Sequence, residues 1–147
     1  MSKLLSIRPA WAALAYVCLD TVCVGMGMGV PIFCILLGFP VGWYIARSVT
    51  LGNSQIQRIL GVSLRHALLC SLFTLLVMAA IWGRNIPMLF DPSADLANFG
   101  IPMILYEPKA SFVGWQVLMI GISPALQLLA IVFGAYVTLV AWARGKK

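Results

Sequence analysis

The sequence predicts an all-α integral membrane protein with four transmembrane helices, and three observations predict it. Of its 147 residues, 62% are hydrophobic and only 10% are charged, whereas soluble domains carry roughly 45–50% apolar and about 25% charged residues. Several uncharged runs approach or exceed the roughly 20 residues that a helix needs to cross a bilayer. The basic residues stand singly at the ends of these runs, as topology signals do. Residues 1–147 are therefore expected to form a single membrane domain in contact with the lipid bilayer.

The first long apolar run extends from Pro9 to Ala46 and contains one charged residue, Asp20. It is nearly twice as long as one span, so two short spans, residues 9–25 and 30–46, fit best. A glycine-rich tight hairpin is expected between them, because glycine relaxes the backbone and Pro31 suits the start of a helix.

The middle of the chain is predicted to form a cytoplasmic loop followed by the third span. Residues 47–65 are the most polar part of the sequence. They fit either a short amphipathic helix on the membrane surface or an ordinary connecting loop. The third span, residues 66–82, has no charge and is closed by Trp82, an aromatic residue typical of the membrane interface.

Residues 83–111 are predicted to form an ordered extracytoplasmic loop between the third and fourth spans. This segment contains four prolines and three of the four acidic residues. Asp91 followed by proline is a typical helix start, so a short helix over residues 92–99 is expected, with Gly100 as its stop.

The last span is predicted over residues 115–142. No charge occurs in the 32 residues from Ser111 to Trp142, which is too long for one upright helix. The segment offers no polar turn for two helices, so one helix that is tilted or kinked at Pro124 is the better interpretation.

The charge distribution predicts that both termini are cytoplasmic in a plasma (inner) membrane, because basic residues close to spans are retained inside. Scattered bases of this kind do not indicate a nucleic-acid partner. Only Arg84 and Lys109 would lie outside, together with three acids. Eight bases would lie inside: Lys3, Arg8, Arg47, Arg58, Arg65, Arg144, Lys146 and Lys147.

Small residues within the spans are predicted to form helix-packing positions, because they allow two helix backbones to approach closely. Gly38 and Gly42 have the GxxxG spacing, although Pro40 between them makes a kink an equally good interpretation. The expected packing residues are Gly25, Gly29, Gly38, Gly42, Ala130 and Gly134.

Asp20 is the one acidic residue predicted inside a span. It lies about a dozen residues into the first span, near mid-depth at about 1.5 Å per residue. An intramembrane acid is a candidate for a proton or cation site, with Thr21, carbonyls of the glycine turn or Gln127 completing the shell. The alternative is that Asp20 lies near the outer surface and is hydrogen-bonded to another helix.

No catalytic, cofactor or metal site is predicted. The four cysteines form no CxxC pair, and the single histidine, His66, cannot supply both axial ligands of a haem. We therefore expect a non-enzymatic subunit, assembly or scaffold protein that acts through helix–helix contacts, as a homo-oligomer or in a larger membrane complex. The alternative function is a small proton- or cation-coupled transporter or channel that uses Asp20.

Overall fold

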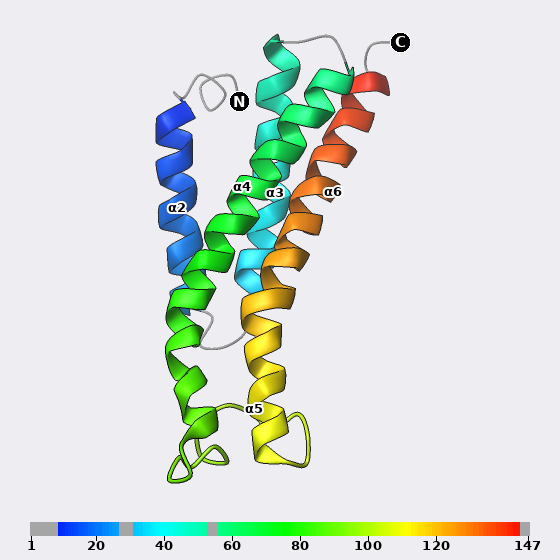
Figure 1. Ribbon diagram of the computed structural model, residues 1–147. Coiled ribbons are helices and arrows are strands. Elements are labelled where there is room, and N and C mark those ends of the chain that lie inside the picture. Colours follow the sequence, from blue (N-terminus) through cyan, green and yellow to red (C-terminus); the bar gives the residue numbers. More distant parts are fainter. Residues whose placement is uncertain (1–8, 27–30, 53–55, 145–147) are drawn as a thin grey trace.

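The computed structural model describes residues 9–26, 31–52 and 56–144, and this part of the chain is helical with turns and no strands. Helices α5, η2 and α6 follow one another without a break, so the described chain forms four helices (Figure 1). The predicted all-α fold with four helices is confirmed. The elements are α2 (Pro9–Met26), α3 (Ile32–Gly52), α4 (Ile56–Trp82), the 3₁₀ helix η1 (Gly83–Phe90), α5 (Pro108–Gln116), the π-helix η2 (Val117–Ile122) and α6 (Ser123–Arg144).

The four helices run antiparallel to one another in chain order, so α2 begins and α6 ends at the same end of the bundle (Figure 1). We call this the terminal end. At the opposite end α4 and α5 extend beyond α2 and α3 and carry residues 83–107, which we call the end lobe. The glycine-rich hairpin predicted between α2 and α3 falls on residues 27–30, which lie outside the described chain, as does Gly29.

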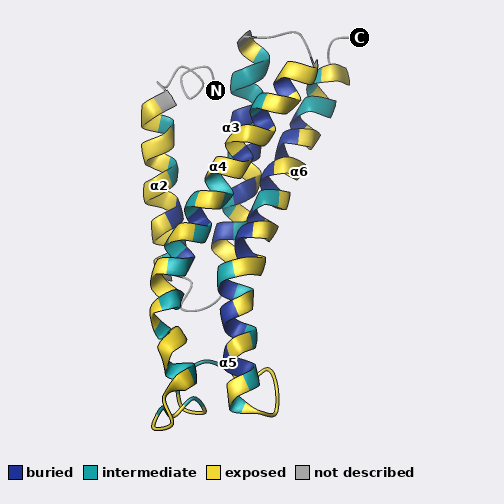
Figure 2. Ribbon diagram, viewed as in Figure 1, coloured by how far each residue is buried: buried dark blue, intermediate teal, exposed yellow. Residues whose placement is uncertain are grey.

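Three of the helices are long and apolar enough to cross a membrane, and α2 is apolar but shorter. Their lateral surface is largely exposed (Figure 2). Five leucines of α4 at four-residue intervals show about half of their side-chain surface, and apolar surface of this extent suggests a membrane protein. These leucines are Leu60, Leu64, Leu68, Leu72 and Leu76.

Helix α4 begins ten residues earlier than the predicted third span. Residues 56–65 continue it, and α3 reaches Gly52, so neither an independent surface helix nor a long loop connects the two. The reason is a buried face that runs through both parts of α4 at helical spacing. That face consists of Ile59, Ser63, Ala67, Thr74 and Met78.

The helix predicted over residues 92–99 is absent, and this segment consists of turns. Asp91 accepts from the Ser93 N–H at 2.9 Å as expected of a cap. However, the Asp95 carboxylate accepts from the backbone N–H and the side chain of Asn98. Local bonds of this kind compete with the helical pattern, which is marginal over eight residues. Gly100 ends the segment with a positive φ of 87°.

The long final helix contains a π-helical turn immediately before Pro124. Proline has no N–H, so it cannot donate to the carbonyl one turn earlier. The Ser123 N–H bonds instead to Leu118 O, five residues back, and the Ser123 hydroxyl donates to the same oxygen at 2.7 Å. The predicted single helix is therefore continuous through Pro124, and the irregularity is taken up by η2.

Candidate functional site

Four polar side chains meet where α2, α4 and α6 come together. Tyr16 and Asp20 come from α2, Thr74 from α4 and Gln127 from α6. We call them the polar cluster. Asp20, Thr74 and Gln127 each have an exposed fraction of 0%, so their polar atoms depend on one another for hydrogen bonds.

Both carboxylate oxygens of Asp20 are engaged by a neighbouring helix. Thr74 Oγ1 lies 2.8 Å from Oδ2 and can donate to it, and Gln127 Nε2 donates to Oδ1 at 2.8 Å. The Tyr16 hydroxyl donates to the Cys70 carbonyl at 2.9 Å, lies 3.1 Å from Thr74 Oγ1 and accepts from Gln127 Nε2 at 3.3 Å. The cluster therefore joins α2 to two other helices through the side chains of Tyr16 and Asp20.

Of the residues that the sequence placed around Asp20, the structure brings only Gln127 to it. The Thr21 side chain is exposed, and its hydroxyl donates to Val17 O of the same helix at 2.7 Å. The carbonyls of the glycine turn lie in residues 27–30, outside the described chain. Sequence reasoning missed Tyr16 and Thr74. Tyr16 precedes Asp20 by one helical turn, a signal that was available, whereas nothing in the sequence shows that Thr74 faces α2.

The predicted packing residues concentrate between α3 and α6. A Cβ at Gly38 would lie 2.8 Å from the Ala130 Cβ, and a Cβ at Gly134 would lie 2.5 Å from Phe39 O. A Cβ at Gly42 would meet Ile131 O and would lie 2.8 Å from the Ala135 nitrogen. Gly25 is different, because nothing lies within 4 Å of a Cβ there. The helix backbones thus approach closely at three glycines and Ala130, and Gly25 takes no part.

The acids of the end lobe are bound locally and are not gathered into one site. Donation by the Ser93 hydroxyl and N–H to Asp91 Oδ1, at 2.6 and 2.9 Å, lowers the pKa of Asp91. Donation by the Asn98 side chain and N–H likewise lowers the pKa of Asp95. Glu107 caps α5, since its Oε2 accepts from the Ala110 N–H at 3.1 Å.

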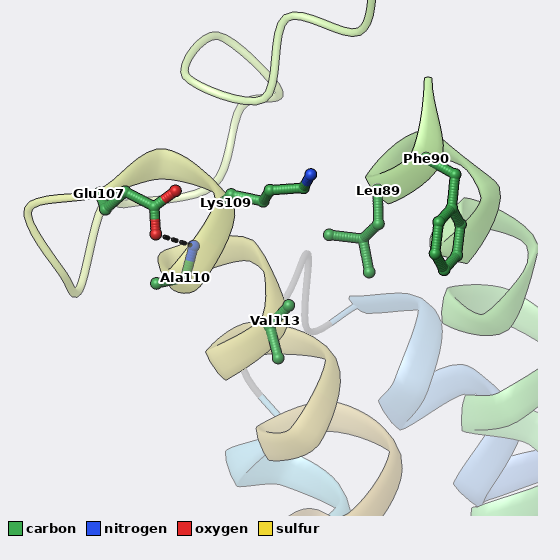
Figure 3. A pocket seen from close by; sticks show the side chains of 6 residues that line it. All are labelled: Leu89, Phe90, Glu107, Lys109, Ala110 and Val113. Atoms are coloured by element: carbon green, nitrogen blue, oxygen red, sulfur yellow. Dashed lines mark hydrogen bonds between the residues drawn. The ribbon is translucent and has the colours of Figure 1, made fainter. Parts of the chain in front are cut away.

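An open depression of about 460 Å³ lies between η1 and the first turns of α5 (Figure 3). One oxygen of the Glu107 carboxylate caps α5, and Lys109 contributes the one positive charge of the lining. Figure 3 shows this side chain extending toward Leu89 and Phe90. A single exposed lysine over an apolar floor does not define a specific site. The lining residues are Leu89, Phe90, Glu107, Lys109, Ala110 and Val113.

The chemistry open to the polar cluster is hydrogen bonding and proton exchange, because its groups are one carboxyl, two hydroxyls and one amide. Among the described residues, no group of three or more His, Cys, Asp or Glu side chains could hold a metal ion. Cys18, Cys23, Cys34 and Cys70 are all free thiols. No protein-family model matches the chain, and comparisons with curated proteins and with solved structures gave no match.

Proposed function

We propose that the protein spans the plasma (inner) membrane four times with both termini in the cytoplasm. Helix α2 qualifies as the fourth span because its 18 residues extend about 27 Å, close to the roughly 30 Å of hydrocarbon in a bilayer. The antiparallel order supports an even number of crossings, since α2 begins and α6 ends at the same end. The bases near that end, such as Arg58 and Arg144, agree with the positive-inside rule.

This orientation puts the polar cluster near the middle of the hydrocarbon. Thr74 lies nine residues after Arg65 and eight before Trp82, which corresponds to about 13 Å and about 12 Å along α4. Arg65 and Trp82 would mark the two membrane surfaces. Asp20, bonded to Thr74, would share that depth, which supports the mid-depth interpretation over a position near the outer surface.

Cysteine labelling tests the orientation. In a variant without the four native cysteines, Asn98→Cys in the end lobe is expected to react with a membrane-impermeant maleimide on intact cells. Gln57→Cys at the terminal end, which is also exposed, serves as the matched position and should react only after permeabilisation. Labelling of Gln57→Cys but not Asn98→Cys on intact cells would show that the topology is the reverse of the one proposed.

We further propose that the protein is a non-enzymatic subunit or scaffold that binds a transmembrane helix of another subunit along the first turns of α2, residues 10–15. The uneven packing of α2 carries this proposal. Tyr16 and Asp20 bond α2 to α4 and α6, whereas five of the six side chains of residues 10–15 are exposed. Trp11 and Leu14 have exposed fractions of 63% and 51%.

The composition of residues 10–15 favours a helix over lipid as their neighbour. Four of the six residues 10–15 are alanine, and small residues let a second helix come close enough for backbone packing. Helix α4 provides the contrast, because its exposed face is a row of leucines, which suits acyl chains. Trp11 adds a large side chain that can anchor the contact.

Photo-crosslinking tests the partner contact. Benzoylphenylalanine in place of Ala13 is expected to give a discrete protein adduct in native membranes, and in place of exposed Leu72 on α4 it should give lipid adducts only. An adduct of twice the mass of the chain would identify a second copy, and any other discrete mass a different subunit. Equal yields at the two positions, or no protein adduct at either, would count against binding at α2.

A second candidate function, proton- or cation-coupled transport through Asp20, is favoured by one observation. Asp20 is fully buried and joined to two other helices, so a change in its charge would act on three helices together. Such a transporter requires that Asp20 exchange a proton or cation. Titration of the Asp20 carboxyl by infrared spectroscopy tests proton binding, and Asp20→Asn should abolish flux in reconstituted vesicles.

A further inference from the structure

The hydrogen bonds of Asp20 are different at its two oxygens. Oδ1 faces Gln127 Nε2, an amide nitrogen that can only donate. Oδ2 faces Thr74 Oγ1, a hydroxyl that can donate or accept. A proton on Oδ1 would therefore meet another donor, whereas a proton on Oδ2 has an acceptor 2.8 Å away.

The Thr74 hydroxyl can donate to a second acceptor, which leaves its oxygen free to accept a hydrogen bond from Asp20. The hydroxyl lies 3.3 Å from the Cys70 carbonyl, one turn earlier on α4. When the Thr74 hydrogen points to that carbonyl, Oγ1 can accept from Asp20. When it points to Asp20, Oγ1 donates to a carboxylate. Both forms of Asp20 are hydrogen-bonded without movement of any heavy atom.

No cation in the described chain offsets a charge on Asp20. The titratable groups closest to it are the Tyr16 phenol and the Cys23 thiol on α2, the Cys34 thiol on α3 and the Cys70 thiol on α4. Helix α6 contributes the neutral amide of Gln127. An unpaired carboxylate at membrane depth is costly, and each of these groups is neutral or would add negative charge.

We infer that the polar cluster is a proton-binding site, in which Asp20 carries one proton on Oδ2 at neutral pH and donates it in a hydrogen bond to Thr74 Oγ1. On uptake, an O–H bond forms at Oδ2, the Asp20 O–H donates to Thr74, and the Thr74 O–H turns to the Cys70 carbonyl. On release, the proton leaves to solvent, Asp20 becomes a carboxylate, and the Thr74 hydrogen turns back. No oxidant, reductant or co-reactant takes part.

A proton fits this site better than a metal cation of the same charge. Both oxygens of Asp20 already lie 2.8 Å from a neighbouring side chain, and a metal ion with several oxygen ligands would have to separate the three helices. A proton requires no additional volume. The proton site is also independent of the proposed partner helix, because none of the four polar side chains belongs to residues 10–15 and the purified chain contains the whole cluster.

Infrared spectroscopy of the purified protein in dodecyl maltoside, which has no carbonyl group, tests the proposal. At neutral pH the wild type is expected to show a carboxylic-acid C=O band that disappears as the pH is raised. The band should be absent from Asp20→Asn. It should move to higher frequency in Gln127→Leu, because the amide that donates to Oδ1 is removed.

The end-lobe acids provide the matched control. Asp91, Asp95 and Glu107 are exposed, so a variant with all three replaced by their amides should keep the band. If Asp20→Asn does not fold, aspartate labelled with carbon-13 at the carboxyl group should shift the same band in the unaltered protein. Absence of an aspartate acid band at neutral pH would overturn the proposal. Its loss on addition of sodium chloride at constant pH would also overturn it, since that result indicates a metal-cation site.

Discussion

Replacing Gly42 by alanine is expected to lower the free energy of unfolding by about 3 kcal/mol, the upper part of the range for overpacking a close contact. The added Cβ would meet Ile131 O and would lie 2.8 Å from the Ala135 nitrogen. These are backbone atoms of α6, so a side-chain rotation cannot relieve the clash. The substitution must instead separate α3 from α6, the pair that contributes Ile45 and Ile131 to the buried hydrophobic core.

Unfolding in mixed micelles with increasing denaturing detergent measures this effect. Gly61→Ala on α4 is the matched control, because nothing lies within 4 Å of a Cβ there. It is expected to change stability by no more than about 1 kcal/mol, and in the stabilising direction, since alanine is the better helix former. A second variant, Gly134→Ala, should behave like Gly42→Ala because its Cβ would lie 2.5 Å from Phe39 O. Equal stability of Gly42→Ala and Gly61→Ala would show that α3 and α6 do not pack as described.

The second large effect is expected from the polar cluster. Gln127→Leu leaves Oδ1 of Asp20 buried without its donor, at a cost of about 2 kcal/mol. Asp20→Leu alone removes the 2.8 Å acceptor of the Gln127 amide and leaves that amide the longer bond to the Tyr16 hydroxyl, at 3.3 Å. The double variant removes both Asp20 and Gln127. Its loss of stability should therefore be smaller than the sum of the two single losses by about 1 kcal/mol, a coupling within the range for bonds between membrane helices.

The same unfolding measurement on the four proteins of this double-mutant cycle gives the coupling directly. Thr21→Val is the control, because the Thr21 hydroxyl is exposed and bonds only to Val17 O of its own helix. Its effect should stay within about 0.5 kcal/mol, as for other exposed substitutions. Additive effects of Asp20→Leu and Gln127→Leu would mean that the two side chains do not stabilise each other.

These two sets of contacts attach the helices by different means. The α3–α6 pair depends on glycines, which have no side chain and therefore allow the two helix backbones to meet. Helix α2 depends on Tyr16 and Asp20, which bond to Thr74 and Gln127. In the proposed bilayer, lipid would compete well for apolar surfaces but poorly for hydrogen bonds, so a short helix such as α2 would gain more from polar contacts. A protonation change at Asp20 would therefore act on the attachment of α2 to α4 and α6.

The helical fold could be predicted from the sequence because it depends on local properties. The length of the apolar runs and the absence of charges within them predict long helices whatever their neighbours are. The helix boundaries were harder to predict from the sequence. Residues 56–65 are polar on one side, and their continuity with α4 follows from a buried face that only the packed bundle displays. The segment 92–99 has a typical helix start, yet side-chain bonds of Asp95 and Asn98 favour turns.

The candidate site, like the fold, could be predicted only in part from the sequence. The sequence by itself identified Asp20 as the exceptional residue, because one acid in an apolar run is visible without a structure, and it placed Gln127 among the possible partners. Only the tertiary structure decided that Thr74 and Tyr16 complete the cluster and that Thr21 does not. The physical reason is that neighbouring side chains on a helix point in different directions. Which direction faces another helix depends on how the helices rotate and pack, and glycine contacts such as Gly42 against Ile131 set that packing here.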